Sequence, residues 1–299
     1  MPKPTDADFR AGYVAIVGRP NVGKSTLLNR LVGQKVSITS RKPQTTRQRV
    51  TGILTVDNAQ LLFVDTPGFQ TQYGSALNRG MNRVVTQALA EVDVVLFVIE
   101  ALRFSAEDQS VLKLLPVQRP VLLVINKTDK LADRRLLLPF IGQMAQQYSF
   151  AEIVPVSAAK GHSTAELARA ISGYLPQQPA LYAADEITES SERFLAAELI
   201  REKLFRLLGD ELPYVCAVLI DRFVMERSLR RIQASIIVDK ESQKGIIVGA
   251  KGSRLKEIGT QARIDMEKLF GGKVYLELWV KVKSGWAENR QLLKQLGYG

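Results

Sequence analysis

The sequence predicts an α/β domain built on a doubly wound, mostly parallel sheet, followed by a smaller α+β domain. Across the first half, short apolar runs alternate with amphipathic stretches, as strands and helices alternate in such sheets. The segment Pro176–Asp185 then contains two prolines and no hydrophobic period, which is typical of a linker. Beyond it, strands and helices follow one another in a different order. We therefore place a first domain at residues 1–179 and a second, with the linker, at residues 180–299.

The strands of the first domain are predicted from short, continuous runs of valine, leucine and isoleucine that end at turn residues. These runs are Tyr13–Val17, Gln60–Asp65, Val92–Glu100, Val121–Asn126 and Ile153–Ser157. Between them, the spacing of apolar residues indicates helices at Ser25–Val32 and from Glu107 to Leu114. This alternation favours parallel strands joined by crossover helices.

The second domain is predicted to begin with a helix that Ser191 caps and whose apolar residues recur every three or four positions. Alternating residues then indicate strands, and an apolar stripe indicates a second long helix. The strands are Val215–Arg222, Arg231–Val238 and Val274–Lys283, and the helix is Ser253–Phe270. A tail helix is expected near Gln291. The resulting order, α-β-β-(α)-α-β, defines an α+β domain.

Composition limits the function before any motif is considered. The chain has 299 residues, 46% of them hydrophobic, which fits two globular domains. The single cysteine, Cys216, cannot form an internal disulfide. The polar segment Met1–Arg10 carries no apolar signal-peptide core, and no apolar run has the length of a membrane span. We therefore expect a cytoplasmic protein. Its net charge of +11 favours a polyanionic partner, either nucleic acid or an acidic membrane surface.

A glycine-rich segment follows the first predicted strand and opens the first helix. It consists of Gly18, Arg19, Pro20, Asn21, Val22, Gly23, Lys24, Ser25 and Thr26, and it fits the G-x-x-x-x-G-K-S phosphate-loop pattern. Backbone N–H groups of such a loop surround phosphate oxygens at a helix N-terminus. Lys24 supplies a cation for the β- and γ-phosphates, and the Ser25 hydroxyl can bind Mg²⁺. The strand–loop–helix context disfavours the alternative, a plain glycine turn.

A second segment ends the strand that begins at Gln60. It consists of Asp65, Thr66, Pro67, Gly68 and Phe69. A carboxylate at this end of a strand can hold Mg²⁺, often through water, and Gly68 can bring its N–H close to a γ-phosphate because it has no Cβ. Alone, this segment would indicate a turn, since aspartate, proline and glycine all favour turns. With a phosphate loop upstream, a nucleotide site is favoured.

Two further segments predict which base is bound. Asn126, Lys127, Thr128 and Asp129 end one apolar strand, and Ser157 and Ala158 end the next. Asp129 can accept two hydrogen bonds from the ring N–H and the amino group of guanine, an arrangement that adenine does not offer. Backbone N–H groups near Ser157 can reach the guanine carbonyl oxygen. The sequence therefore favours GTP and GDP over ATP.

The order and spacing of these four segments resemble P-loop GTPases of the translation-factor-related class. In that class, a threonine that precedes the second segment meets Mg²⁺ when the γ-phosphate is present. Thr45 and Thr46 both stand at this place, and we assign Thr46 on the resemblance alone. The resemblance thus implies Mg²⁺ as a cofactor, with Ser25, Thr46 and Asp65 as its ligands.

The position after Gly68 departs from GTPases that resemble Ras, in which a glutamine orients the attacking water. Here Phe69 can neither donate nor accept a hydrogen bond. The only histidine, His162, lies near the base-binding segments and is not expected to act as a base. Asn21 resembles the asparagine of K⁺-activated GTPases, which suggests K⁺ as a further cofactor. We expect slow hydrolysis, with Asn21, Lys24, Thr46 and Gly68 acting at the phosphates.

A Gly-x-x-Gly loop in the second domain predicts RNA binding. Gly249, Ala250, Lys251 and Gly252 lie between an apolar run and a long helix, and Arg254 and Lys256 follow. Glycines allow a sugar–phosphate backbone to approach closely, and the lysine supplies charge. A glycine turn without function remains the alternative. With the order of elements, this loop resembles a KH domain of type II.

The last predicted strand has an apolar face and a second face that carries Tyr275, Trp279, Lys281 and Lys283. The aromatic side chains of this second face can stack on bases. Packing of Trp279 against another element is an equally good interpretation.

As a whole, the chain resembles bacterial GTPases that end in a type II KH domain, down to the segment LELWVKVKSGW. The resemblance implies that the protein binds small-subunit ribosomal RNA near its 3′ end, acts in small-subunit maturation and associates loosely with the inner membrane face. We expect it to be a monomer. Two alternatives stay open. One is an RNA-binding protein with a structural nucleotide, and the other is a regulatory GTPase at a membrane surface.

Overall fold

The computed structural model describes residues 8–40, 42, 45–56, 58–69, 76–209 and 212–288, and of residues 76–80 the backbone alone. The chain forms two compact units. The first contains the residues up to Ser37 and those from Thr46 to Glu189, and the second contains residues 38–45 and those from Ser190 onward. The expected tail helix near Gln291 lies outside the described residues. None of the described helices is long and apolar enough to cross a bilayer.

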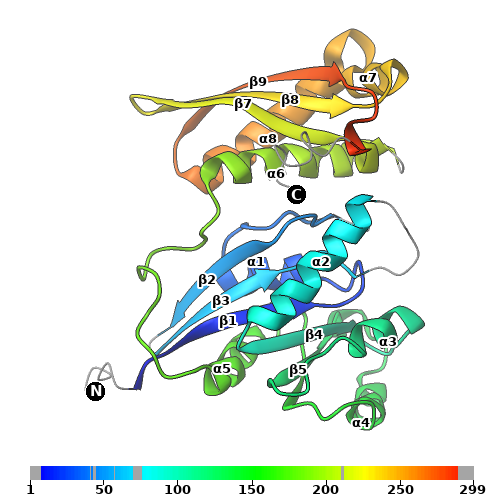
Figure 1. Ribbon diagram of the computed structural model, residues 1–299, viewed down its shortest axis with the longest axis vertical. Coiled ribbons are helices and arrows are strands. Elements are labelled where there is room, and N and C mark those ends of the chain that lie inside the picture. The colour runs from blue at the N-terminus through cyan, green and yellow to red at the C-terminus, as the bar shows by residue number, and fades with distance from the viewer. Residues whose placement is uncertain are drawn as a thin grey trace. The chain divides into compact units, whose positions relative to one another are not determined.

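The first unit contains a six-stranded sheet in the order β2-β3-β1-β4-β5-β6 (Figure 1). Its strands are β1 (Arg10–Val17), β2 (Val50–Val56), β3 (Ala59–Asp65), β4 (Val94–Glu100), β5 (Val121–Asn126) and β6 (Glu152–Pro155). All neighbours pair in parallel except β2, which runs antiparallel to β3. The doubly wound, mostly parallel sheet is therefore confirmed, with the edge strand β2 as an addition to the prediction.

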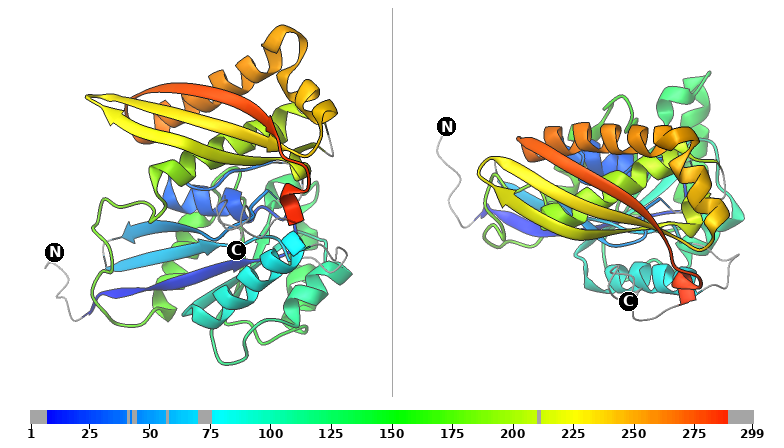
Figure 2. Two further views of the ribbon diagram at one scale, coloured as in Figure 1. Left: turned by 45° about the horizontal axis from the view of Figure 1, so that its top comes forward. Right: turned by 90° about the horizontal axis from the view of Figure 1, so that it is seen from above.

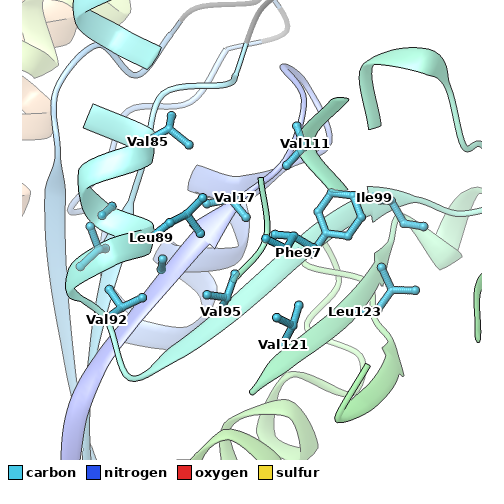
Figure 3. Packing of buried hydrophobic residues seen from close by; sticks show 14 of the residues in the cluster. Val17, Val85, Leu89, Val92, Val95, Phe97, Ile99, Val111, Val121 and Leu123 are labelled. Atoms are coloured by element: carbon cyan, nitrogen blue, oxygen red, sulfur yellow. The ribbon is translucent and has the colours of Figure 1, made fainter. Parts of the chain in front are cut away.

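Among the described residues, the helices between these strands are α1 (Lys24–Val32), α2 (Ala76–Glu91), α3 (Ala106–Leu112) and α4 (Leu137–Ala145), and α5 (Thr164–Tyr174) follows β6. Valine, leucine and phenylalanine side chains from β1, β4 and β5 pack against α2 and α3 (Figure 3). Val17, Phe97 and Leu123 of this cluster have no solvent exposure. Because parallel strands buried on both faces need continuous apolar runs, the sequence pattern located these strands well.

The predicted linker contains no helix and packs along the first unit. The backbone N–H of Gln178 donates to the carbonyl oxygen of Phe9 over 3.1 Å. The buried side chain of Gln60 exchanges hydrogen bonds with the backbone of Leu181 and Tyr182. By its contacts the first unit thus runs to Glu189, ten residues beyond the predicted boundary at residue 179.

The second unit has the predicted order of elements. It contains α6 (Glu192–Leu207), β7 (Ala217–Glu226), β8 (Leu229–Val238), α7 (Glu241–Val248), α8 (Ser253–Phe270) and β9 (Lys273–Val282). The sheet order is β7-β8-β9, with β7 antiparallel and β9 parallel to β8. Side chains of α6 and α8 pack on one face of this sheet, and Figure 2 shows both helices beside the strands. Ser191 caps α6 as predicted, because its hydroxyl accepts the N–H of Phe194.

The opposite face of this sheet is partly covered. Trp286, only 2% exposed, packs on Ala217 and Ile237 at one end of the face. Tyr275 and Trp279 are 44% and 43% exposed farther along β9. Among the described residues, Trp279 belongs to neither apolar cluster of this unit, and both interpretations of it given above stay open.

Candidate functional site

The glycine-rich segment joins β1 to α1, so that its loop lies at the carboxyl edge of the parallel sheet. Asn21 and Gly23 have positive φ angles of 63° and 103°. A Cβ at position 23 would lie 2.4 Å from Nδ2 of Asn126, so glycine is required there. Lys24 is buried and donates to the carbonyl oxygens of Gly18 (2.9 Å) and Arg19 (3.0 Å). Burial lowers the pKa of Lys24 to about 8.

Three hydroxyl groups converge on the fully buried Asp65 at the end of β3. Its Oδ2 accepts hydrogen bonds from Ser25 (2.6 Å), Ser37 (2.8 Å) and Thr46 (3.3 Å). Its Oδ1 is buried and has no hydrogen-bond partner among the described residues. Burial raises the pKa of Asp65, although these hydroxyls and the charge of Lys24 oppose the rise.

This oxygen cluster fits a small divalent cation, because Mg²⁺ prefers carboxylate and hydroxyl oxygens and an orphaned carboxylate oxygen is costly without a ligand. The geometry separates the two candidate threonines. The Thr46 hydroxyl lies 3.0 Å from that of Ser25, whereas the Thr45 hydroxyl donates to the carbonyl oxygen of Lys42.

The base-binding segments meet at the ends of β5 and β6. Asn126 donates through Nδ2 to the carbonyl oxygen of Val22 (2.8 Å) and accepts through Oδ1 from the N–H of Ala158 (3.0 Å). The Ser157 hydroxyl donates to Oδ1 of Asp129 over 2.5 Å. Asn126 therefore joins the phosphate loop to both base-binding segments, and Ser157 orients the carboxylate predicted to bind guanine.

Some predicted residues point elsewhere. The Thr66 hydroxyl donates to the carbonyl oxygen of Ile16 within the sheet. Phe69 packs partly buried against the apolar cluster of the first unit. The Arg19 side chain binds the carboxylates of Asp108 and Glu100.

Sequence reasoning missed Ser37, Glu100 and Asp108, which contact the predicted site residues. Ser37 shares Asp65 with the predicted ligands, and the two carboxylates share Arg19. The position of Glu100 at the end of an apolar strand was a usable signal, because strand ends at this edge carry the site. Ser37 and Asp108 do not lie at the end of a predicted strand, so the sequence carries no comparable signal for them.

The Gly-x-x-Gly loop lies between α7 and α8, as predicted. Gly249, Lys251 and Gly252 have φ angles of 69°, 49° and 79°. A Cβ at position 249 would lie 2.8 Å from Cβ of Arg254. Lys251 and Lys256 are exposed, and Arg254 is exposed with one N–H on the carbonyl oxygen of Ile246. The loop is thus tightly folded, with its cations directed to solvent.

A cavity of about 370 Å³ continues from this loop along α8 and β9. Leu255, Leu276 and Leu278 supply apolar lining, and Lys256 and Arg263 supply charge. An apolar groove flanked by cations suits an unpaired nucleotide strand, whose bases and phosphates face different surfaces.

Together, the fold and the two sites define a P-loop GTPase domain followed by a KH domain. Residues 13–127 match the family described as "50S ribosome-binding GTPase", and residues 211–287 match the KH domain family. The chain is 58% identical to GTPase Era of Nitrosomonas eutropha and 56% identical to GTPase Era of Neisseria meningitidis serogroup A. These alignments cover 97% of this chain, and 98% and 95% of the two relatives.

This chain therefore belongs to the Era family of GTPases. Two solved structures of Era superpose on it with a TM-score of 0.93 at 43% identity, over 97% of this chain. One, from Aquifex aeolicus, is bound to GDP and AlF4⁻ and is covered over 100% of its length. The other is in complex with MgGDPNP and nucleotides 1506–1542 of 16S ribosomal RNA and is covered over 99%.

Proposed function

We propose that this GTPase is a switch that binds small-subunit ribosomal RNA near its 3′ end and acts in maturation of the small ribosomal subunit. The observation that carries the proposal is the presence of both sites in one chain that aligns end to end with Era. The family description of the first unit names the 50S subunit, but it covers residues 13–127 alone. The RNA-bound relative spans both units and contains 16S ribosomal RNA.

In this proposal, the loop from Gly18 to Thr26 binds the phosphates, and Asp129 with Ser157 and Ala158 binds guanine. Ser25, Thr46 and Asp65 would hold Mg²⁺, which neutralises charge on the β- and γ-phosphates when it is bound. Lys24 adds a second positive charge there, and Gly68 offers its N–H to the γ-phosphate. Both groups lie in segments that the sheet holds at its carboxyl edge.

Hydrolysis is proposed to be slow, because Phe69 occupies the place of a water-orienting glutamine and its ring packs on the core. Asn21 stands in the left-handed conformation within the loop, with φ of 63°. We propose that its side chain helps to bind K⁺ beside the phosphates. Turnover measured in KCl and in NaCl tests this role: equal rates in the two salts would rule it out.

The RNA site is proposed to be the Gly249–Gly252 loop with Arg254 and Lys256, together with the groove between α8 and β9. The exposed cations suit phosphates, and the leucine lining suits bases. The exposed Tyr275 and Trp279 lie on the opposite face of the sheet and are not needed for this groove.

A chain segment offers a route for coupling the nucleotide to the RNA. Residues 38–45 group with the second unit, although Ser37 and Thr46 on either side of them bond Asp65 in the first. A ligand that draws Thr46 away from Asp65 therefore acts on one end of this segment.

Described residues of this segment also bond to the second unit. The Thr39 N–H donates to Glu202 of α6 over 3.0 Å, and Lys42 donates to the carbonyl oxygens of Leu208 (2.7 Å) and Gly209 (2.9 Å). We therefore propose that Mg²⁺ and the γ-phosphate change RNA binding through these contacts, as in other switches that order a segment.

Affinity for an RNA oligonucleotide in three states tests the proposal: no nucleotide, GDP and a non-hydrolysable GTP analogue, all at one salt concentration. Each is repeated with Lys251→Ala and Arg254→Ala, and with Lys113→Ala as a matched surface control in the first unit. The switch is supported if RNA affinity depends on the nucleotide and falls in Lys251→Ala and Arg254→Ala but not in Lys113→Ala. If RNA affinity is the same in all three nucleotide states, an RNA-binding protein with a structural nucleotide is favoured.

We further propose that the protein is a monomer that works in the cytoplasm and contacts the inner membrane face transiently. Flotation with anionic vesicles tests the membrane contact, and binding that is unaffected by salt would argue against a purely electrostatic contact. Sedimentation of the full chain tests the monomer.

A further inference from the structure

A chain of charged side chains links the phosphate loop to the base-binding segment. Arg19, whose side chain is 5% exposed, contacts Oδ2 of Asp108 through Nε (3.1 Å) and Oε2 of Glu100 through Nη2 (3.2 Å). The same Oε2 accepts the ammonium group of Lys127 over 2.9 Å. One carboxylate oxygen thus joins a cation of the phosphate loop to a cation of the base-binding segment.

The backbone fixes each member of this ionic chain. Glu100 ends β4 and pairs in register with Asn126, the residue before Lys127. Asp108 lies in the first turn of α3, where it forms a capping box with Ser105. Lys127 itself has a positive φ of 67°, a conformation that non-glycine residues seldom adopt, so its side chain is directed by tertiary contacts.

Charge and burial both bear on this ionic chain. Burial alone would raise the pKa of Glu100, but Lys127 and Arg19 outweigh it and lower that pKa. Asp108 is completely buried, and its Oδ1 has no hydrogen-bond partner among the described residues. A buried guanidinium between two carboxylates resists rearrangement, because freeing either partner leaves an uncompensated charge.

The loop and the base-binding segment are therefore held together twice. The neutral link is the hydrogen bond from Asn126 to the carbonyl oxygen of Val22, and the ionic link is the chain Arg19–Glu100–Lys127. The neutral link fixes the middle of the phosphate loop, whereas the ionic link fixes its beginning and the Lys127 side chain.

We infer that Glu100, with Arg19 and Asp108, is a positioning residue for guanine nucleotides: it holds Lys127 and the start of the phosphate loop at a fixed spacing, and so sets how slowly nucleotide leaves. The three residues act through Lys127 and the loop, and none of them needs to touch the nucleotide. Arg19, predicted above as a nucleotide ligand, contributes its backbone to the loop and its side chain to this support.

Release of a fluorescent GDP analogue from the full-length protein, followed by stopped flow with excess unlabelled GDP, tests this inference. We expect Glu100→Gln, which keeps the shape and removes the charge, to speed release about tenfold, the low end for loss of a charge-assisted hydrogen bond. The same change in a Lys127→Met background should speed release by a smaller factor, because only the part of its effect that passes through Arg19 and the loop remains. Equal effects in both backgrounds would overturn the inference.

Two further variants separate positioning from stability. Arg19→Lys keeps the charge but loses the planar guanidinium that bonds both carboxylates at once. The release rate of this variant should therefore lie between those of wild type and Glu100→Gln. Release at the wild-type rate contradicts the inference. Glu91→Gln breaks the exposed Arg49–Glu91 ion pair of the same unit and is the matched control, with unchanged release expected. Thermal unfolding of every variant shows whether faster release merely follows lost stability.

Discussion

Gly68 leaves no room for a side chain beside the phosphate loop. A Cβ at position 68 would lie 2.9 Å from the nitrogen and Cγ of Pro20 and 3.0 Å from its Cα. Ordinary contacts begin near 3.4 Å, so Gly68→Ala requires a shift of about 0.5 Å. Pro20 follows Arg19, which ion pairs with Asp108 and Glu100 anchor, so we expect residue 68 to be the one that moves.

This shift would pull the N–H of residue 68 away from the position proposed for the γ-phosphate. Overpacking of this kind costs about 1–3 kcal/mol, which corresponds to roughly 5- to 150-fold in affinity. We expect that loss for a GTP analogue and less than about threefold for GDP, which has no γ-phosphate. Competition against a fluorescent nucleotide measures both affinities for one preparation.

Gly142→Ala is the control for this prediction. Gly142 lies within α4, where an added Cβ meets nothing within 4 Å, so both nucleotide affinities should stay unchanged. If Gly68→Ala binds the GTP analogue as tightly as wild type, or loses GDP to the same extent, the steric reasoning is refuted.

Three further predictions concern the base, a carboxylate and a tryptophan. Asp129→Asn should weaken GTP about 100-fold without improving ATP, and a retained GTP preference in competition assays would exclude Asp129 as the base-reading group. Since the folded-state pKa of Glu100 lies below its ordinary value of 4.5, its ion pairs stabilise the protein above that pH and are lost as the pH falls through the lowered pKa. The melting-temperature difference between wild type and Glu100→Gln should thus be full at pH 7 and vanish in acid; a constant difference would contradict it. Trp286→Ala should destabilise the second unit by about 3–5 kcal/mol in urea, whereas Trp279→Ala, at a 43% exposed site, should cost under about 1 kcal/mol.

Much of the first unit could be predicted because each signal is local. The strands β1, β3 and β5 are continuous apolar runs, and each ends in residues that carry the site. Since parallel strands end at one edge, order along the chain was enough to bring Lys24, Asp65 and Asn126 together. Helix α8 was predicted to the residue because its apolar stripe is flanked by Gly252 and Gly271.

Strand β2 was not predicted, and its sequence explains why. Gly52 interrupts the apolar run, and a glycine at such a position weakens the prediction of a strand. In the fold, a Cβ there would meet Leu28 at 2.7 Å and Val32 at 2.8 Å, so this glycine admits helix α1 against the sheet. The ionic chain through Glu100 was equally hidden, because it depends on which strands become neighbours.

The parallel pairing of β8 with β9 also fixes when the second unit becomes functional during synthesis. Strand β8 is made early, but its partner β9 follows only after α7, the Gly249–Gly252 loop and α8. When the entire GTPase domain has left the ribosome, the loop proposed to bind RNA therefore still lacks the strand that forms one side of its groove. Trp286 is made later still and covers one end of the opposite face of the sheet. The nascent chain thus acquires the nucleotide site before the groove that we propose for RNA, so that an unfinished protein has no complete groove with which to occupy ribosomal RNA.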